Sequence, residues 1–419
     1  MEFSTIKGFK DILPDEVGNW QQLEKKARRL FHVFGFNEIK TPVLERTELF
    51  SRGIGQETDI VSKEMYTIPD SKGRGQTLRP EATASVVRAY IQHRLYQKYP
   101  VQKLFSIGPM FRHERPQRGR YRQFHQINAE FIGDPGPKSD ADLIILCMSL
   151  INNLGLNELK LQINSLGCLK CRPLFQHELQ DNLAQKEDAL CEDCLRRSKT
   201  NPLRVFDCKV EGCRQIVSKA PTISDFLCAE CLDHFNALKS YMNDVKVPFA
   251  IDHSLVRGLD YYTRTTFEIQ TEHLGAQNAV AGGGRYDGLV KLLGGPDHPA
   301  IGFAIGMERI IALISEQHDK TKINRPNLFI AAIGEKAEIE TFQWVMKLRK
   351  AGFWVEIDYA AKGLKSQMKK AGRLAVKKVL IVGDDEIATG KAILRDMDTK
   401  NQDEVDLQDI INKLKELLL

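Results

Sequence analysis

The chain has 419 residues, 42% of them hydrophobic, so it has ample material for buried cores, and its length suggests two or three domains. Its longest apolar runs, residues 143–148 and 310–314, are far shorter than the ~18 residues that a spanning helix needs, and the N-terminus lacks a signal-peptide pattern. We therefore expect a cytoplasmic protein, and a net charge of +5 from 60 basic and 55 acidic residues neither requires nor excludes a polyanionic partner.

The first third of the chain predicts helices and then a pair of strands. Apolar residues at helical spacing predict helices over residues 20–34 and 82–96, and a strand is expected over residues 37–43. Two runs with period-two character, residues 104–114 and 120–131, predict adjacent antiparallel strands.

The middle of the chain predicts an insertion. Between about residues 140 and 248 the sequence is helical and cysteine-bearing, and strand-like patterns return over residues 255–270 and 278–283. This interval therefore interrupts a β-rich domain. A strand that runs into a helix is expected over residues 301–314.

The end of the chain predicts a second, smaller domain after a linker at residues 318–327. Strands and helices alternate there: strand 328–333, helix 336–351, strand 354–357, a further helix, and strand 378–382. This alternation is typical of a small α/β domain with a mostly parallel sheet.

Residues 111–126, FRHERPQRGRYRQFHQ, concentrate arginines in the predicted strand pair, with Arg112 and Glu114 sharing a face of the first strand. Arginine forks match phosphate oxygens, so the segment suits a ligand with phosphates at one end and a base in the middle. A solvated strand face or a nucleic-acid-binding hairpin would explain the arginines as well. Alternation puts one ordered set of side chains on a single face of the second strand: Arg120, Arg122, Phe124, Gln126, Asn128 and Glu130.

Two other segments carry residues that suit the same ligand. The segment LRPEATAS contains Arg79, Glu81 and Thr83. Of these, Glu81 and Thr83 can jointly accept hydrogen bonds from an ammonium group. A proline at the start of a helix with an acidic first turn explains this segment equally well. The segment LVRGLDYYTRTTFEI contributes Arg257, Asp260, Tyr261 and Tyr262.

Two glycine-containing segments complete the set of candidates. The glycines at residues 282–284 let backbone approach a ligand closely, although a tight turn or a β-bulge is an alternative cause. Arg309 falls in the first turn of a helix that follows a glycine-containing strand, so it can reach a phosphate. The alternative is an exposed arginine on an amphipathic helix.

In chain order, these segments resemble the motifs of a known family. TPVLERTELF, FRHERPQRGRYRQFHQINAEF and GFAIGMERI resemble motifs 1, 2 and 3 of class II aminoacyl-tRNA synthetases. LVRGLDYYTRTTFE and AGGGRYDGL resemble two signatures particular to histidyl-tRNA synthetases. The opening KGFKDILPDE and the final α/β segment fit the same family, so the resemblance covers nearly the whole chain.

The resemblance implies an ATP site with two catalytic cations. Arg112 and Arg257 would contact the ATP α-phosphate and the histidine carboxylate. The outer phosphates and the adenine would contact four further residues: Arg120 and Arg309 at the phosphates, Phe124 stacked on the base, and Glu114 near its edge.

The resemblance also implies a histidine site beside the ATP. A buried carboxylate at Glu130 would discriminate the imidazole from an apolar isostere, because unpaired buried polar groups are costly. The implied histidine-binding residues are Glu81, Thr83 and Gln126 at the ammonium group, Glu130 with Tyr262 at the imidazole, Arg257 at the carboxylate, and Tyr261.

The implied protein is a dimeric enzyme of the α+β class. Its catalytic domain, residues 1–320, would hold an antiparallel sheet flanked by helices, interrupted at about residues 165–248 by the helical insertion, and residues 326–419 would bind the anticodon. The histidine carboxylate would attack the ATP α-phosphate to give histidyl-adenylate and pyrophosphate. The histidyl group would then pass to the 3′ end of tRNA(His), with Mg²⁺ neutralising the outer phosphates.

A basic run in the last domain suits the tRNA. Residues 360–378 hold seven basic residues and no acidic one. A solvated helix face is the alternative, but a stripe without compensating acids in a nearly balanced protein suits a polyanion. Five of these side chains recur at helical spacing: Lys362, Lys365, Lys369, Arg373 and Lys377.

Eight of the nine cysteines fall into four closely spaced pairs. Eight thiolates could complete two tetrahedral Zn²⁺ sites, but reduced thiols in a helical module and a redox function stay open as alternatives, and the spacing does not reveal how the pairs combine. The ninth, Cys147, sits in an apolar run and is expected in the core. The pairs are Cys168/Cys171, Cys191/Cys194, Cys208/Cys213 and Cys228/Cys231.

Two other function classes compete with the enzyme. A regulatory paralogue would sense histidine without charging tRNA, but such a protein is expected to lose the phosphate arginines or the terminal domain, and this sequence keeps both. A zinc-dependent nucleic-acid-binding protein would explain the cysteines and the basic stripe, but not the ordered polar strand face.

Overall fold

The structure is a computed structural model that describes residues 3–56, 58–117, 119–273, 278–317, 325–360 and 362–418; the side chains of residues 316 and 317 are not described. It contains two compact units, Met1–Asp319 and Lys320–Leu419. Most of the expected linker, residues 318–327, lies outside the described residues. No described helix is long and apolar enough to cross a membrane.

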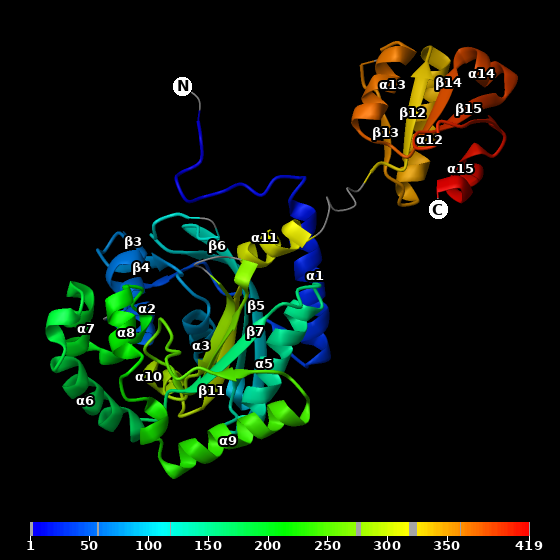
Figure 1. Ribbon diagram of the computed structural model, residues 1–419. Helices are drawn as coiled ribbons and strands as arrows, with labels where there is room; N and C mark the ends of the chain where they lie inside the picture. The colour runs from blue at the N-terminus through cyan, green and yellow to red at the C-terminus, as the bar shows by residue number, and fades with distance from the viewer. Residues whose placement is uncertain are drawn as a thin grey trace. The chain divides into compact units, whose positions relative to one another are not determined.

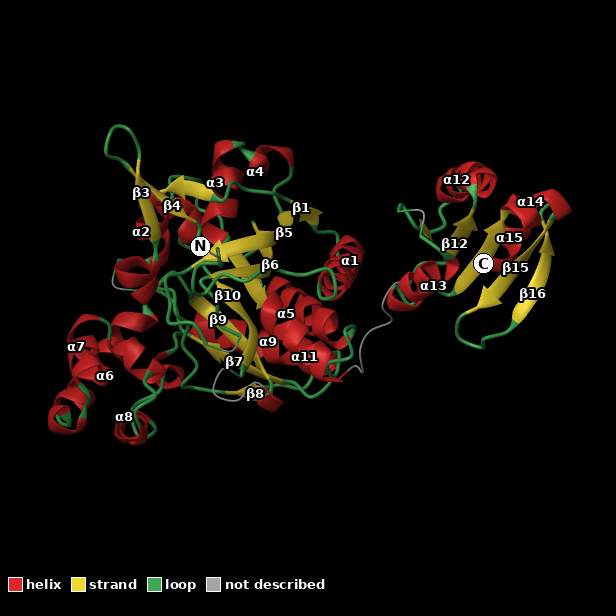
Figure 2. Cartoon of the chain, turned by 90° about the horizontal axis from the view of Figure 1, so that it is seen from above, coloured by secondary structure: helices red, strands yellow, loops and turns green. Residues whose placement is uncertain are grey.

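The first unit is built on an eight-stranded sheet (Figures 1 and 2). Its inner pairings are antiparallel, and only the outermost pairs, β1 with β5 and β7 with β8, are parallel. Across the sheet the order is β1 (Asn37–Glu38), β5 (Gln102–Phe111), β6 (Gln123–Ile132), β11 (Ala300–Gly306), β10 (Ala279–Arg285), β9 (Thr263–Gln270), β7 (Lys160–Ser165) and β8 (Ala250–Ile251).

Four helices cover one face of this sheet and form the main core with it. They are α1 (Val17–Val33), α5 (Pro137–Asn152), α9 (Ala229–Asp244) and α11 (Met307–Gln317). Phe31 of α1 stacks on Phe105 of β5 with ring centroids 4.2 Å apart, and Cys147 of α5 is fully buried in the same core. An apolar interior of this size is the main source of stability in such a domain.

A small three-stranded sheet and short helices border the opposite face. The sheet order is β2 (Leu44–Arg46), β4 (Gly75–Leu78) and β3 (Tyr66–Pro69). The helices are α2 (Thr47–Ile54), a π-helical turn at Ile60–Glu64, α3 (Thr83–Gln92), α4 (Leu95–Lys98) and α10 (Leu289–Leu292). They leave the middle of this face open, and a pocket lies there.

The cysteine-bearing insertion leaves the sheet after β7 and returns through α9. It contains α6 (Cys171–Ala184), α7 (Glu192–Thr200) and α8 (Glu211–Val217), with short 3₁₀ turns at Glu187–Ala189, Pro202–Asp207 and Ile223–Phe226. These helices gather at one side of the first unit in Figure 1. Phe175, Leu179, Val205 and Ile223 give the insertion a small core of its own.

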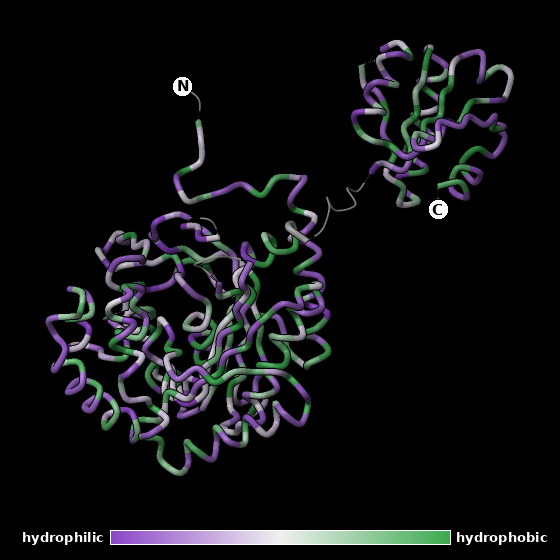
Figure 3. The backbone as a smooth tube through the Cα atoms, in the orientation of Figure 1, coloured by the Kyte–Doolittle hydropathy of each residue, from purple (hydrophilic) through white to green (hydrophobic). Residues whose placement is uncertain are grey.

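The second unit holds a five-stranded sheet with helices around it. The strand order is β13 (Val355–Ile357), β12 (Leu328–Ile333), β14 (Lys378–Gly383), β15 (Lys391–Asp396) and β16 (Gln402–Asp406). The helices are α12 (Glu335–Lys350), α13 (Leu364–Arg373), α14 (Asp384–Thr389) and α15 (Ile410–Leu418). The central strands are largely hydrophobic along their length, as Figure 3 shows, which is typical of strands covered on both faces.

Two expectations about sheets and strands are wrong. The sheet of the second unit is mixed, because β12 pairs with β13 and β14 in parallel whereas β14–β15 and β15–β16 are antiparallel. The interval that predicted only helices contains β7, a strand of the main sheet. Its alternating pattern is short, and its neighbour β9 follows nearly 100 residues later, so local sequence gives no sign of the pairing.

The expected strand pair is shorter than predicted where it approaches the arginines. The strands end at Phe111 and resume at Gln123, so Arg112, Glu114 and Arg120 lie in the connection, which includes the undescribed residue 118. Other segments take over the pairing: the amide of His113 donates to Glu64 O (2.7 Å) and that of Arg122 to Gly8 O (2.8 Å).

Three other elements also have different bounds from those predicted. The expected strand over residues 37–43 is only the two-residue β1, and the expected strand over residues 255–270 begins at Thr263. The helix expected over residues 82–96 ends at Gln92, because Arg94 adopts a left-handed conformation (φ 48°), before the short α4 begins. Such interruptions depend on contacts with other elements and not on local propensity.

Candidate active site

One face of β6 forms a wall of the pocket, and its other face belongs to the core. Ile127, Ala129 and Phe131 are in the main core. The alternate residues Gln126, Asn128 and Glu130 point the opposite way, and the first two line the pocket directly. We call Gln126, Asn128 and Glu130 the strand wall. The alternation expected from the sequence is therefore confirmed for this part of the strand.

Small residues on the neighbouring strands make room for a ligand on the sheet. Gly302 lies opposite Glu130, and Ala304 lies opposite Asn128 in β11. A β-carbon at Gly302 would overlap the Glu130 carboxylate, so only glycine leaves space for that side chain. Gly282 of β10 follows in the row beside Ala304. These small residues therefore leave space for a ligand on the surface of the sheet, between polar side chains.

The deepest polar group of the pocket region is the Glu130 carboxylate. Thr83 Oγ1 donates to it over 2.7 Å, and the Tyr286 hydroxyl also donates to it. Burial raises the pKa of Glu130 to about 8, although these hydrogen bonds oppose the rise. Glu130 does not line the pocket itself, but it is hydrogen-bonded to Thr83 and Tyr286, which do. Tyr286 is thus a further residue bonded to Glu130, while Tyr262, which the resemblance pairs with Glu130 at the imidazole, lines the same pocket.

Glu81 presents a second buried carboxylate at the start of α3. Its two oxygens accept hydrogen bonds from the amides of Thr83 and Ala84, each at 2.8 Å. Burial raises the pKa of Glu81, and its backbone hydrogen bonds lower it in part. Since each carboxylate oxygen has a further lone pair, Glu81 can also accept from a ligand ammonium group.

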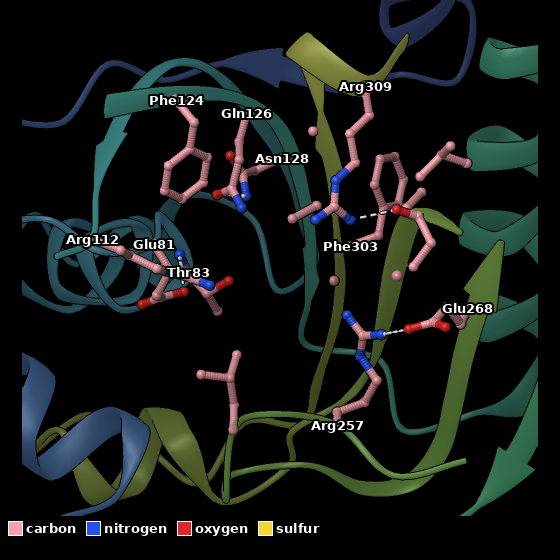
Figure 4. A pocket seen from close by; sticks show the side chains of 18 of the residues that line it. Glu81, Thr83, Arg112, Phe124, Gln126, Asn128, Arg257, Glu268, Phe303 and Arg309 are labelled. Carbon is pink, nitrogen blue, oxygen red and sulfur yellow. Dashed lines mark hydrogen bonds and ion pairs between the residues drawn. The ribbon is translucent and has the colours of Figure 1, made fainter. Parts of the chain in front are cut away.

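Four arginines converge on the same pocket: Arg112, Arg120, Arg257 and Arg309. Figure 4 shows Arg112 beside Glu81 and Thr83 on one side, with Arg257 and Arg309 on the other. Burial lowers the pKa of Arg309, and the neighbouring charges of Arg120, Arg112 and Arg257 lower it further. Clustered cations repel one another, so this arrangement favours a polyanionic ligand between them.

The arginines are held by specific partners. Arg112 Nε donates to Pro80 O (2.9 Å), Arg120 pairs with Glu114, and Arg309 donates to Ala279 O. Arg257 pairs with Glu268, as the dashed line in Figure 4 shows. The Arg257 guanidinium covers Gly282, where an added β-carbon would lie 2.5 Å from Arg257 Nη2.

The residues 252–262, between β8 and β9, form the wall opposite β6. This loop carries Arg257, Tyr261 and Tyr262, all of which line the pocket, and we call these three residues the loop wall. The rings of Tyr261 and Tyr262 lie 4.8 Å apart. The loop has no strand pairing, so contacts from other elements must hold it.

Phe124 offers an aromatic face near the arginines. The Arg112 guanidinium lies 5.3 Å from the centre of its ring, and both residues line the pocket with Glu114. Arg122, which shares the parity of Phe124, turns elsewhere: it donates to Glu114 O (3.1 Å) and Lys7 O (3.4 Å). The predicted polar face is therefore interrupted at Arg122, the residue before β6 begins.

Among the pocket residues without an assigned role from the sequence are three polar groups on the strands or beside them. Asn128 was placed on the strand face without a function, and Glu268 and Tyr286 were not singled out. Glu268 lies opposite Gly282 in the sheet, and Tyr286 follows the glycines of β10 by two residues. The sequence therefore contained a signal for Tyr286, which lies in the segment GGGRYDGL, whereas Glu268 comes beside the glycines only in the folded sheet.

The eight paired cysteines form two separate clusters. Every Sγ atom in a cluster lies within 4.8 Å of the others. No cysteine of the described chain forms a disulfide. One cluster is Cys168, Cys171, Cys228 and Cys231, and the other is Cys191, Cys194, Cys208 and Cys213.

The basic run of the second unit is only partly helical. Lys365, Lys369 and Arg373 lie on α13 at intervals of four, whereas Lys362 precedes the helix and Lys377 follows it. All five side chains are exposed. Three residues therefore form the helical stripe that was expected of five.

Comparisons with known proteins agree over nearly the whole chain. A family model described as histidyl-tRNA synthetase matches residues 8–310, and one described as an anticodon binding domain matches residues 327–417. A protein of Desulfosudis oleivorans named histidine–tRNA ligase is 57% identical over 405 residues, which cover 97% of this chain and 96% of that relative.

Solved structures show the same fold. The apo histidyl-tRNA synthetase of S. aureus matches with a TM-score of 0.83 and 34% identity, covering 99% of this chain and 100% of that one. A protein from Bacillus halodurans described as an ATP phosphoribosyltransferase regulatory subunit/histidyl-tRNA synthetase matches with a TM-score of 0.64 and 20% identity, covering 91% of this chain and 99% of that one. At that identity the likeness shows the fold alone.

Proposed function

This chain belongs to the histidyl-tRNA synthetase family, and from that premise we propose how it works as an ATP-dependent histidine–tRNA ligase. It activates histidine with ATP and transfers it to tRNA. The observation that carries the detailed proposal is the convergence of four arginines on a pocket whose far end is backed by a buried, hydrogen-bonded carboxylate at Glu130.

The amino acid would lie between Glu81 and the end of the strand wall. The ammonium group would bind Glu81, Thr83 and Gln126, because each offers an oxygen at the pocket surface. The imidazole would lie next to Tyr286 and Thr83, which link it to Glu130, with Tyr261 and Tyr262 beside it. A site that hydrogen-bonds a polar ring rejects apolar analogues, because they leave buried groups unpaired.

The nucleotide would take the other end of the pocket. Phe124 would stack on the adenine near Glu114, and Arg120 and Arg309 would contact the outer phosphates. Arg112 and Arg257 would hold the α-phosphate and the histidine carboxylate together. We include Mg²⁺ in this proposal, since a divalent cation would neutralise the charge of the outer phosphates beside Arg120 and Arg309.

The reaction would proceed by positioning and charge stabilisation. A carboxylate oxygen of histidine attacks the α-phosphorus, a new P–O bond forms, and the bond to the β-phosphate oxygen breaks as pyrophosphate leaves. The terminal ribose hydroxyl of tRNA then attacks the carbonyl carbon and releases AMP. No side-chain nucleophile is needed, and Arg257 would stabilise the charge that develops at the α-phosphate.

The second unit would bind the tRNA anticodon. Its match to an anticodon-binding family model and its exposed basic residues support this role. Phosphate contacts make binding salt-dependent. Replacing Lys365, Lys369 and Arg373 together with alanine should therefore raise the KM for tRNA(His) severalfold without changing histidine-dependent ATP–pyrophosphate exchange; an unchanged KM for tRNA would remove the stripe from the interface.

Five other expectations belong to the same proposal. We propose that the enzyme is a cytoplasmic homodimer that acts on tRNA(His), and that its paired cysteines hold structural zinc. We also keep the boundaries expected from the sequence: a catalytic domain at residues 1–320, an insertion at about residues 165–248, and an anticodon-binding domain at residues 326–419.

Aminoacylation distinguishes the ligase from a histidine-sensing regulator. The retained Arg112, Arg120, Arg257 and Arg309 and the matched anticodon-binding unit disfavour the regulator. Purified protein should attach labelled histidine to tRNA(His) transcripts in the presence of ATP. Histidine binding without any charging would instead support the regulator, and nucleic-acid binding without ATP turnover would support a zinc-dependent binding protein.

A further inference from the structure

The insertion contains two clusters of four cysteines whose geometry matches a metal tetrahedron. Measured Sγ–Sγ distances are 3.6 Å for Cys168–Cys171, 3.9 Å for Cys168–Cys228 and 3.8 Å for Cys191–Cys208. A Zn–S bond of about 2.3 Å in a tetrahedral site gives a sulfur–sulfur edge of about 3.8 Å. Both clusters therefore have the size of a Zn²⁺ site with four thiolate ligands.

We propose that the insertion binds two Zn²⁺ ions, one per cysteine cluster, and that the two centres hold the loop of residues 252–262 in its position beside the pocket. The first half of this proposal stands on the cysteines alone. The second half rests on the proposed function, because it assigns the loop to histidine binding.

Backbone amides point at the sulfur atoms as in zinc knuckles. The amide of Cys228 donates to Cys171 Sγ (3.1 Å), and that of Lys170 donates to Cys168 Sγ (3.4 Å). In the second cluster the amide of Cys191 donates to Cys213 Sγ (3.3 Å). Donors aimed at sulfur favour thiolates, the form that binds metal.

Other uses of the cysteines fit less well. A disulfide requires sulfur atoms about 2.05 Å apart, far closer than the distances in either cluster. An iron–sulfur cluster binds its cysteines through separate iron atoms, so its thiolates need wider spacing than one shared ion. Four thiolates packed together without a cation would repel one another.

The first centre lies where the insertion leaves the catalytic sheet and where it returns. Cys168 and Cys171 follow β7, and Cys228 and Cys231 begin α9. The backbone joins the first pair to the start of β9, because the amide of Leu166 donates to Arg264 O (2.6 Å) and that of Arg264 donates to Gly167 O (2.8 Å). This junction lies two residues after Tyr262.

The second pair of the same centre is anchored in the core through α9. His234 Nε2 lies 2.8 Å from Asp140 Oδ2, and Asp140 also pairs with the fully buried Arg285 of β10. One ion would thus link the segment that is bonded to the start of β9 with the start of α9. The cysteines that it joins, Cys168 and Cys228, lie 60 residues apart in the sequence.

Each centre also carries its own contact to the loop. Arg172, the residue after Cys171, donates to Tyr262 O. Asn201 and Arg204 lie between Cys194 and Cys208, and both donate to Asp260 Oδ1 at 3.2 Å. Short chain segments connect these three donors to the cysteines that would bind zinc. We therefore expect loss of zinc to displace the donors and weaken their hydrogen bonds to the loop, in addition to any unfolding of the insertion.

Metal analysis of the full-length protein tests the first half. Inductively coupled plasma mass spectrometry should find two zinc ions per chain. Cys168→Ser and Cys208→Ser should each leave one, and the double variant none, whereas the matched control Cys147→Ala should keep two. A wild-type protein that is fully active with no zinc, or that holds iron with acid-labile sulfide, would overturn the proposal.

Steady-state exchange kinetics test the second half. A displaced loop would hold Tyr261 and Tyr262 away from the histidine site. We therefore expect Cys168→Ser to raise the KM for histidine about tenfold, with the KM for ATP nearly unchanged. Cys168→His, which keeps a zinc ligand, should restore both metal and KM. Loss of zinc with an unchanged KM for histidine would refute the positioning role.

The two tests also separate this proposal from the enzyme assignment. Zinc content is measured without any substrate, so two zinc ions in a protein that cannot activate histidine would uphold the metal sites and sink the proposed function. Partial unfolding alone would lower the number of active sites, counted by active-site titration, without changing the KM for histidine.

Discussion

The two walls of the pocket are held in place by different means. The strand wall, Gln126, Asn128 and Glu130, is fixed by hydrogen bonds between β6 and its neighbours β5 and β11. The loop wall, Arg257, Tyr261 and Tyr262, has no such ladder. It is held by backbone hydrogen bonds from Asp252 to Ile163 and from Asp260 to Ile54, and by side chains from the insertion. Asn164 adds two more, since its Nδ2 donates to His253 O (3.2 Å) and Leu255 O (3.1 Å).

This difference makes the two walls respond differently to substitution. A wall built into a sheet keeps one geometry, because a shift of register would turn every side chain to the other face. A wall on a loop can adjust, and local openings of such segments cost less than global unfolding. We therefore expect variants of the strand wall to change specificity, Arg257→Ala to slow adenylate formation, and variants that loosen the loop wall from outside the pocket to weaken histidine binding.

The largest effect is expected from the loop wall itself. Arg257→Ala should reduce histidine-dependent ATP–pyrophosphate exchange by roughly 10³-fold, because it removes a cation placed where charge develops in the transition state. The rate constant for adenylate formation measured by rapid quench is the direct readout. Arg197→Ala is a matched control, since that arginine pairs with Asp59 outside the pocket. A loss below tenfold for Arg257→Ala would mean that this arginine has no catalytic role.

The next largest effect is expected from the strand wall. Glu130→Gln should raise the KM for histidine roughly 100-fold and leave the KM for ATP nearly unchanged, because it alters the group that backs the imidazole site. Arg112→Ala should do the reverse, slowing adenylate formation with little loss of histidine discrimination. If both variants showed the same defect, the division between recognition and catalysis would be wrong.

A smaller effect should follow from loosening the loop wall from outside the pocket. Arg204→Ala removes one of the two side-chain donors to Asp260, and Arg204 itself does not line the active-site pocket. We expect about a tenfold rise in the KM for histidine, with no change in ATP affinity measured by equilibrium binding. Arg214→Ala, an exposed arginine of the same insertion, should leave both values at the wild-type level. Equal behaviour of the two variants would argue against the loop contact.

The smallest effect concerns stability and its dependence on pH. The pKa of Glu130 is about 8 in the fold and 4.5 in the unfolded chain, so the folded protein keeps a proton that the unfolded chain has lost. The free energy of unfolding should therefore fall as pH rises from about 4.5 to about 8. Glu130→Gln removes this contribution, so its melting temperature should exceed that of the wild type by several degrees at pH 8 and by less at pH 5. A constant difference across this range would mean that Glu130 is not a buried acid.

Much of the strand wall followed from the sequence, whereas the loop wall followed only from the family resemblance. Period-two alternation at residues 123–131 was enough to place Gln126 and Glu130 on one face. It failed at Arg122, because the amide of this residue donates to Gly8 and its side chain turns to Glu114 and Lys7. The sequence pattern did not indicate that residues 255–262 form a loop. Their conformation depends on contacts with residues distant in the sequence, among them Asn164, Arg172 and Arg204.

The pairing of the cysteines could not be predicted from the sequence for a similar reason. Their spacing predicted metal ligands but not which pairs combine, because the chain segments between the pairs form helices whose packing decides the outcome. In the fold, the first pair meets the last, and the two middle pairs meet each other. Tyr286 and Glu268 were missed because their importance lies in what faces them across the sheet.

The most direct test of the central claim is an ATP–pyrophosphate exchange assay with each of the 20 amino acids in turn. The account predicts exchange with histidine alone, since the buried Glu130 behind the strand wall and the cations around the loop wall suit one imidazole-bearing amino acid and one triphosphate. Well-folded protein that gives no exchange with histidine, or equal exchange with other amino acids, would contradict it.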